Sequence, residues 1–398
     1  MKRVFTFLSI LILVKISFAQ IPLSRIPEEL HFSFDRHRLK YIDTVVNKNI
    51  SDNKIPGAVV LIGRRGKIIY QKAFGNSSLV PEIKPMKIET IFDLASITKP
   101  VATATSIMIL VERGMISLED EVRKYIPEFV AYIDENNKEQ HAKIYHLLTH
   151  TSGLPDYTNA DSIKLKYGSP SPEGTVQTIM NLKKLNSPGT KFQYSCLGFI
   201  TLTEIIKRVT GQTVAEFSEK EIFKPLGMKN TTFNPGKDLL ARCAPTEYRD
   251  GKMTCGFVHD PLAAVQGGIS GNAGLFSTAE DLSIFAQMML NKGGYKGTRI
   301  LGAKTVELMT SIYNKVEFAG RGLGWDVNSA YMGQRGDIFE IGSYGHTGFT
   351  GTSILISPKE GLYLIILTNR VHPDGKGDVL PMRRAIANVV ASSIVDVE

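Results

Sequence analysis

The sequence predicts an α+β fold in which strands from both ends of the chain form one antiparallel sheet that is flanked by helices. Apolar and β-branched runs separated by short polar turns, the pattern of β-hairpins, occur near the beginning of the chain and again near its end. Between about residues 117 and 330 the apolar spacing is mostly helical, with long polar loops. We therefore expect a mainly helical region to be inserted in the sheet domain, with a site at the seam.

The first 19 residues have the pattern of a secretory signal peptide. Two basic residues precede an apolar run over residues 4–16, and Ser-Phe-Ala then fits a small-x-small cleavage site. We expect cleavage before Gln20, a mature domain over 20–398, and export to the periplasm or the extracellular space. An uncleaved anchor is the weaker reading, because the run is short for a membrane span and Lys15 interrupts it.

The composition is that of an ordinary soluble globular protein. Of the 398 residues 22% are charged and 43% are hydrophobic, which allows a sizeable core. The formal net charge is +8, and no run of basic residues with interleaved aromatic ones is present. No nucleic-acid partner is therefore expected, whereas a mild positive charge would suit an anionic cell envelope.

The cysteines are three in number, so at least one has no partner within the chain. Cys243 and Cys255 are candidates for a disulfide whose geometry the sequence does not test. No CxxC pair occurs, which argues against a thiolate zinc site.

The elements can be predicted in chain order. An amphipathic stretch near 38–46 precedes a hairpin with strands at 57–63 and 67–74, and the SLED sequence at 117–120 is typical of a capping box that opens a helix. Helices are expected at 144–148, 175–182, 197–210, 214–222, 278–290 (capped by Ser277 and Glu280) and 380–394. Late strands are expected at 351–356 and 362–367, on either side of a turn at 357–361.

The stretch FDLASITKPVATATSIMILV, residues 92–111, is the centre of the functional prediction. Its apolar residues recur every three or four positions, as in a helix with one buried face. Pro100 is tolerated only in a first helical turn, so the helix should begin near Ser96 and stop at Gly114. Positions three apart share a helical face, which places Lys99 within reach of the Ser96 hydroxyl.

This spacing suits nucleophilic catalysis. A neutral Lys99 could take the proton of Ser96, and the start of a helix leaves backbone N–H groups free for a developing oxyanion. The alternative is that Ser96 is a helix N-cap and Lys99 is solvated. A second SxxK occurs at 51–54, where no helix follows to display it.

Three spaced motifs strengthen the catalytic interpretation: SITK with Ser96 and Lys99, YSC with Tyr194, and HTG with His346. Together they resemble the serine hydrolases that include class C β-lactamases, serine D-Ala-D-Ala peptidases and related esterases, in which SxxK, YxN and K/H-T-G line one cleft. The resemblance covers nearly all of the mature chain and implies a β-lactamase/transpeptidase-like fold.

The resemblance also implies roles. Ser96 would be the nucleophile, Lys99 would accept its proton or tune its partner, and Tyr194 would be the base that later protonates the leaving group. His346 would hydrogen-bond the tyrosine side of the site. The backbone N–H groups of Ser96 and Phe349 would form the oxyanion hole.

Cys196, Thr347 and Gly348 are the expected substrate-binding residues. Cys196 stands where the family commonly has Asn and cannot offer an amide donor and acceptor, which argues against an efficient β-lactamase. His346 stands where many β-lactamases have Lys, and an imidazole with an ordinary pKa of about 6.5 would change its charge near neutral pH.

Other motifs are weaker. His146 and His150 are four apart, as zinc ligands often are, but the Glu of HExxH is missing, so a structural role is favoured. The glycine-rich loop at 267–274 does not match GxGxxG and is expected to line the cleft. His259 and Asp260 could orient a substrate or cap a turn.

The sequence thus predicts an exported serine hydrolase that forms an acyl-enzyme and acts on cell-wall peptide or muropeptide amides. Residues 256–282, 321–326 and 367–373 look like a subgroup associated with cell-wall turnover, some members of which are assigned as amidases of N-acetylmuramoyl-L-alanine. An esterase of small acyl esters, a weak β-lactamase and a catalytically idle envelope-peptide binder are the alternatives. No cofactor, metal or membrane-spanning segment is expected, and the oligomeric state is left open.

Overall fold

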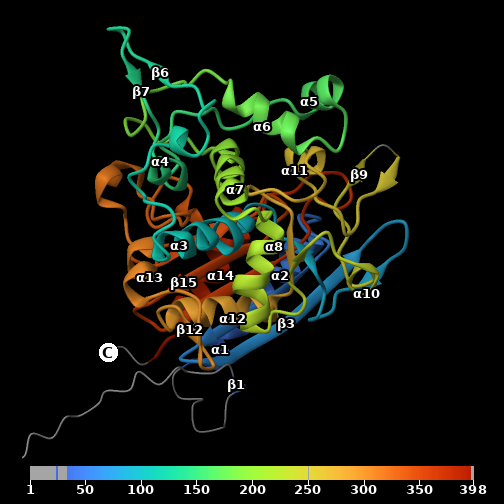
Figure 1. Cartoon of the computed structure of the whole chain (residues 1–398). Helices are drawn as coiled ribbons and strands as arrows, with labels where there is room; N and C mark the ends of the chain where they lie inside the picture. Colours follow the sequence, from blue (N-terminus) through green and yellow to red (C-terminus); the bar gives the residue numbers. More distant parts are fainter. Residues whose placement is uncertain (1–23, 26–33, 250, 396–398) are drawn as a thin grey trace, which may run out of the picture.

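The computed structural model describes residues 24–25, 34–249 and 251–395 (Figure 1). The predicted signal segment, 1–19, lies outside the described residues. A seven-stranded sheet joins the two ends of the chain in the order β1-β3-β2-β16-β15-β14, and β4 pairs with β3. The predicted fold class is confirmed.

Two antiparallel hairpins build this sheet, as predicted. The first is β2 (Gly57–Arg64) with β3 (Lys67–Ser78), and the second is β15 (Ser353–Ser357) with β16 (Leu362–Leu367). β16 lies antiparallel to β2, with Leu364 opposite Ile62, so residues about 300 positions apart become neighbours. The remaining strands are β1 (Ser24–Arg25), β4 (Lys84–Pro85) and β14 (Tyr344–Thr347).

Alternation along β2 gives the sheet two buried faces. Val59 and Leu61 belong to the larger core, which the inserted helices complete, whereas Val60 and Ile62 belong to a second core. Helix α2 (Tyr41–Ser51) and the C-terminal helix α14 (Leu380–Ser392) cover the second face (Figure 1). Helix α12 (Ala279–Leu290) packs on the first face through Leu282 and Phe285.

The other helices belong mainly to the inserted region. Their bounds are α1 (Arg36–Leu39), α3 (Thr105–Glu112), α4 (Ile144–Leu148), α5 (Ala160–Tyr167), α6 (Pro172–Met180), α7 (Cys196–Thr210), α8 (Val214–Ser218), α9 (Lys224–Leu226), α10 (Lys237–Leu240), α11 (Pro261–Val265) and α13 (Ala303–Thr310). A small sheet of β5 (Phe92–Asp93), β11 (Leu275–Ser277) and β8 (Thr232–Phe233) leads into the segment that contains Ser96. Short hairpins are β6 (Tyr132–Ile133) with β7 (Glu139–Gln140), β9 (Tyr248–Arg249) with β10 (Lys252–Met253), and β12 (Gly294–Tyr295) with β13 (Thr298–Arg299).

The predicted helix after the SLED sequence is wrong. The capping contacts form, since the Asp120 carboxylate accepts from the backbone of Ser117, but only a 3₁₀ turn, η4 (Val122–Lys124), follows. The reason is tertiary: the Val122 N–H donates to Ala142 O at 2.8 Å instead of continuing a helix.

Two further details differ from the sequence-based expectation. The predicted helix at 214–222 becomes π-helical after α8, and α12 is capped by Thr278, whose side chain accepts from the Asp281 N–H, and not by Ser277. None of the helices in the described part of the chain combines the length and the apolar character of a membrane span.

Candidate active site

Ser96 lies in a 3₁₀ turn, η2 (Ala95–Ile97), and the chain continues as a π-helical segment, η3 (Lys99–Ala104), before α3 begins. The prediction of one regular α-helix from Ser96 is therefore wrong at its start. Pro100, which has no N–H to donate, sits in the segment where the hydrogen-bonding pattern departs from the α-helical one. The predicted pairing across three positions nevertheless forms.

Lys99 is fully buried and contacts Ser96 directly. Its Nζ lies 2.8 Å from Ser96 Oγ and donates to the backbone carbonyl of Asn272 at 3.0 Å. The Cys196 Sγ is 3.5 Å away, and the Tyr194 ring centroid is 5.1 Å away. The amine is thus held by groups from three separate segments of the chain.

The charge of Lys99 depends on its neighbours. Burial lowers its pKa, but the negative charges that Cys196 and Tyr194 carry when ionised outweigh this and raise the pKa above its ordinary value. Lys99 thus donates a hydrogen bond to Ser96 Oγ, and its role, as the acceptor of the Ser96 proton or as the group that tunes its partner, stays a prediction.

Tyr194 precedes α7 and is packed by aromatic rings on two sides. The His150 ring lies 4.3 Å from it in a stacked arrangement, and the Tyr331 ring lies 5.5 Å away. His346 is next, with its ring centroid 6.2 Å from that of Tyr194. Three residues that are distant in sequence thus fix the position of this phenol.

His346 lies on β14 and is 4% exposed. Its Nδ1 is 2.9 Å from the Thr347 carbonyl oxygen, which can only accept, so the neutral ring carries its proton on Nδ1 and presents a lone pair at Nε2. Burial, together with the charges of Arg321 and Lys99, lowers the pKa of His346 well below 6.5. The burial of His346, which the sequence did not show, argues against a change of its charge near neutral pH.

The backbone N–H groups of Ser96 and Phe349 are available for an oxyanion. Within the described residues neither donates to another group. The turn after β14 is tied to the segment before Ser96, because the hydroxyls of Thr350 and Thr352 donate to the carbonyls of Asp93 and Leu94 at 2.7 and 2.9 Å. This holds the two proposed donors on one frame.

A cavity of about 370 Å³ opens at this point. Its lining includes Ser96, Tyr194, Arg321, His346, Thr347, Gly348 and Phe349. Cys196 is not in this lining; its thiol faces Lys99, and burial raises its pKa. The structure thus brings the sequence-predicted residues together, while their individual roles stay a prediction.

The other sequence candidates have structural contacts. His146 Nδ1 accepts from the Lys143 N–H, and Asp260 caps α11 by accepting from the Ala263 N–H. Asn272 of the glycine-rich loop accepts a hydrogen bond from Lys99 at its backbone carbonyl. Cys243 and Cys255 are free thiols, and in the described part of the chain no group of three His, Cys, Asp or Glu could hold a metal ion.

Sequence reasoning missed several residues at this site. Arg321 is 1% exposed and pairs with Asp326 at 2.9 Å beside the cavity, and the Arg370 guanidinium donates to the Phe349 carbonyl at 2.7 Å. His150 was predicted as a packing histidine, but its contact with Tyr194 had no sequence signal. Only the fold brings these side chains to the cleft.

The fold and this constellation define a serine hydrolase of the SxxK type. The chain belongs to the Beta-lactamase family, whose model matches residues 42–389, and the resemblance seen in the motifs is confirmed.

Two relatives in sequence are named as an amidase and a carboxypeptidase. An N-acetylmuramyl-L-alanine amidase of Bacillus subtilis (strain 168) is 32% identical over 367 residues, which cover 85% of this chain and 82% of that protein. A protein of Escherichia coli (strain K12), provisionally named a D-alanyl-D-alanine carboxypeptidase, is 32% identical over 405 residues, covering 94% of this chain and 92% of that protein.

Solved structures show the same fold. EstCE1, described as a hydrolase with promiscuous acyltransferase activity, has a TM-score of 0.72 at 24% identity and covers 89% of this chain and 99% of its own. A penicillin-binding protein homologue from Caulobacter crescentus has a TM-score of 0.69 at 19% identity, with 93% and 99% covered. At these identities the likeness concerns the fold alone.

Proposed function

We propose that this serine hydrolase forms an acyl-enzyme on Ser96 and acts on peptide or muropeptide amides derived from the bacterial cell wall. The observation that carries the proposal is the contact between the buried Lys99 amine and Ser96 Oγ, 2.8 Å apart, at an open cavity. A serine that only capped a turn would not need a buried cation aimed at its oxygen, because burying a charge without a partner is costly.

The geometry supports a sequence of steps. Ser96 Oγ attacks the acyl carbon and gives up its proton toward Tyr194, whose phenolate form the Lys99 ammonium stabilises. The oxyanion accepts hydrogen bonds from the backbone N–H groups of Ser96 and Phe349. Tyr194 then returns the proton to the leaving amine, and water releases the acyl group from Ser96 by the reverse route.

The choice of substrate class is supported by the names of the relatives, an amidase of N-acetylmuramyl-L-alanine and a D-alanyl-D-alanine carboxypeptidase, which share about a third of their residues with this chain. Export through residues 1–19 is part of the same proposal, since such substrates lie outside the cytoplasm. The export step predicts that the purified exported protein begins at Gln20, which intact-mass measurement would test.

The substrate is tested by incubating the protein with a muropeptide, a D-Ala-D-Ala peptide, a p-nitrophenyl ester and a penicillin, and following both product and intact mass. We expect turnover of a cell-wall amide and a transient mass increase at Ser96. Ser96→Ala should abolish both. Ser51→Ala is a matched control, because Ser51 begins the second SxxK and lies exposed at the end of α2.

The outcomes separate the alternatives. Turnover of the ester alone would make the protein an esterase, and a penicillin adduct that hydrolyses quickly would make it a β-lactamase. If no substrate or fluorophosphonate labels Ser96, acyl transfer is refuted and a binding role for the cleft takes its place.

A further inference from the structure

We propose that Asp93 is a positioning residue whose carboxylate holds both sides of the oxyanion hole, the Ser96 turn directly and Phe349 through His259. This inference rests on the proposed acyl transfer at Ser96. Asp93 is 3% exposed and does not line the cavity, so it acts through its neighbours and not on the substrate.

The two carboxylate oxygens of Asp93 serve different segments. Oδ1 accepts from the N–H of Ala95 at 2.8 Å, and Oδ2 accepts from the N–H of His259 at 2.7 Å. Ala95 immediately precedes the nucleophile, whereas His259 is more than 160 positions further along the chain. One buried carboxyl group thus links the Ser96 turn to the loop before α11.

The Ala95 side of this link holds an unfavourable backbone conformation. Ala95 has φ of 46°, in the left-handed region where an L-residue with a Cβ is disfavoured and glycine is not. The hydrogen bond from its N–H to the carboxylate stabilises this conformation, which sets the direction of the Ser96 N–H and hydroxyl. Without the carboxylate, the turn is expected to relax toward negative φ.

The His259 side reaches the second oxyanion donor. The imidazole of His259 stacks on the ring of Phe349, with centroids 5.6 Å apart and planes 23° apart. On the same residue, Arg370 donates to the carbonyl at 2.7 Å and places its guanidinium 4.4 Å from the ring centroid. Phe349 is 62% exposed, so burial does not fix its position, and these contacts add to the hydroxyl bonds of Thr350 and Thr352 that hold the same turn.

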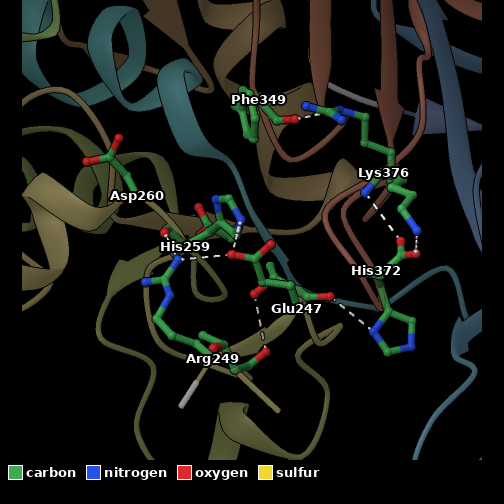
Figure 2. Close-up of polar contacts among 12 residues, drawn as sticks. Glu247, Arg249, His259, Asp260, Phe349, His372 and Lys376 are labelled. Carbon is green, nitrogen blue, oxygen red and sulfur yellow. Dashed lines mark hydrogen bonds and ion pairs between the residues drawn. The ribbon is translucent and has the colours of Figure 1, made fainter. Parts of the chain in front are cut away.

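His259 is itself anchored. Its Nε2 lies 3.0 Å from the Glu247 carboxylate, and Arg249 joins the same carboxylate at 3.2 Å while donating to the His259 carbonyl at 2.5 Å. Figure 2 shows Arg249 and His259 converging on Glu247, with the ring of Phe349 beyond them. The backbone N–H and carbonyl of His259 are thus both hydrogen-bonded, and its ring lies between the Glu247 carboxylate and the ring of Phe349.

The link requires a carboxylate. Both oxygens of Asp93 accept a backbone N–H, and the amide nitrogen of an asparagine can only donate. In Asp93→Asn one of the two N–H groups would face a second donor, so either the Ala95 turn or the His259 loop would lose its hold.

The experiment combines Asp93→Asn with Ala95→Gly, because glycine adopts positive φ without penalty. We would measure kcat and KM for a p-nitrophenyl ester, the rate of Ser96 labelling by a fluorophosphonate, and the melting temperature. Asp93→Asn should lower kcat about 10²-fold with KM within about threefold, as expected for misplaced catalytic groups. In the Ala95→Gly background, the fold loss of kcat caused by Asp93→Asn should be about ten times smaller.

Asp281→Asn is the matched control. Asp281 is also a buried carboxylate that accepts a backbone N–H, from Asn230, but it lies at the start of α12 and outside the cavity lining. It should lower the melting temperature and leave kcat within about threefold, because it contributes to stability alone. Should Asp93→Asn fail to fold, Asp93→Glu, which keeps the charge and displaces it, enters the same comparison.

Two results would overturn the inference. One is an Asp93 variant that lowers only the melting temperature, as the control does. The other is a loss of kcat that is equal in the wild-type background and in the Ala95→Gly background. Failure of the wild-type protein to become labelled at Ser96 is a different result, since it would refute the proposed acyl transfer itself.

Discussion

The imidazole of His150 stacks on the phenol ring of Tyr194, with ring centroids 4.3 Å apart and an angle of 28° between the planes. The same imidazole accepts at Nδ1 from the N–H of Ser195, at 3.0 Å, so the neutral ring carries its proton on Nε2. Burial lowers the pKa of His150 well below 6.5 and keeps it neutral. His150 therefore positions both the proposed base and the residue that follows it.

Two substitutions separate these contacts. His150→Asn can retain the acceptor for Ser195 and the positive φ of 58°, but it loses the stack. We expect it to lower kcat about tenfold, the equivalent of roughly 1.4 kcal/mol. His150→Phe keeps a ring but leaves a buried N–H without an acceptor, which should lower the free energy of unfolding by about 1–3 kcal/mol. Similar kcat values for the two variants, measured on one ester substrate, would argue against the stacking role.

The pH dependence of turnover tests the state of His346. Because its pKa lies well below 6.5, His346 should stay neutral from pH 6 to pH 8 and add no inflection to kcat in that range. His346→Gln, which supplies a neutral acceptor, should therefore leave the shape of the profile unchanged even where the rate falls. An acid limb of kcat near pH 6.5 that disappears in His346→Gln would show that the histidine titrates in the enzyme–substrate complex.

The pH dependence of stability should reflect His146, whose pKa burial lowers to about 4. The folded state holds it neutral, whereas an unfolded histidine takes a proton below about pH 6.5. The unfolded state then binds more protons, so the contribution is complete above pH 6.5 and is lost as the pH falls toward 4, by about 1.4 kcal/mol per pH unit. Between pH 7.5 and pH 5.5 the free energy of unfolding, measured with denaturant, should fall by about 1 kcal/mol more in the wild type than in His146→Gln. Equal losses would contradict it.

Arg321 and Asp326 form a buried ion pair beside the cavity, with Nη1 and Oδ2 2.9 Å apart. Arg321→Met should lower the free energy of unfolding by about 3–5 kcal/mol, because it leaves the Asp326 charge buried without its cation. Asp326 also accepts from the backbone and hydroxyl of Ser329, so Asp326→Asn alone should be damaging as well. Denaturant unfolding should show that the double variant loses much less free energy of unfolding than the two single variants lose together. Additive costs would mean that the two charges do not depend on each other.

Cys196→Asn tests why the YxN pattern is altered. The thiol lies 3.5 Å from Lys99 Nζ and is only a weak donor and acceptor, whereas the amide of Asn has a separate carbonyl acceptor and NH2 donor. We expect Cys196→Asn to raise the rate of Ser96 acylation by a penicillin at least about tenfold, on the scale of one to two hydrogen bonds, with ester turnover within about threefold. Stopped-flow labelling and ester hydrolysis measure the two rates. A parallel change in both rates would assign Cys196 to the tuning of Lys99 and not to substrate selection.

Local signals in the sequence determined a large part of the fold. The two hairpins follow from β-branched runs on either side of short polar turns, and α4, α7 and α12 begin and end within about a residue of their predicted bounds. The contact of Ser96 with Lys99 also follows from local geometry, since residues three apart in a helical turn share a face. The family follows from the order of three motifs.

Only the tertiary structure decided the pKa shifts at the site and the contacts of the residues behind the cavity lining. Burial sets the pKa of His346, and burial depends on which segments share the interior, which a local pattern does not reveal. The same reason applies to Asp93, whose partners are a neighbour in the turn and a residue from a distant loop. No helix follows the SLED sequence because the N–H of Val122 donates to the carbonyl of Ala142, which lies in another segment of the chain. The sequence by itself thus predicted the pairing of Ser96 with Lys99, which the structure forms, whereas long-range packing decided which other groups surround the two side chains.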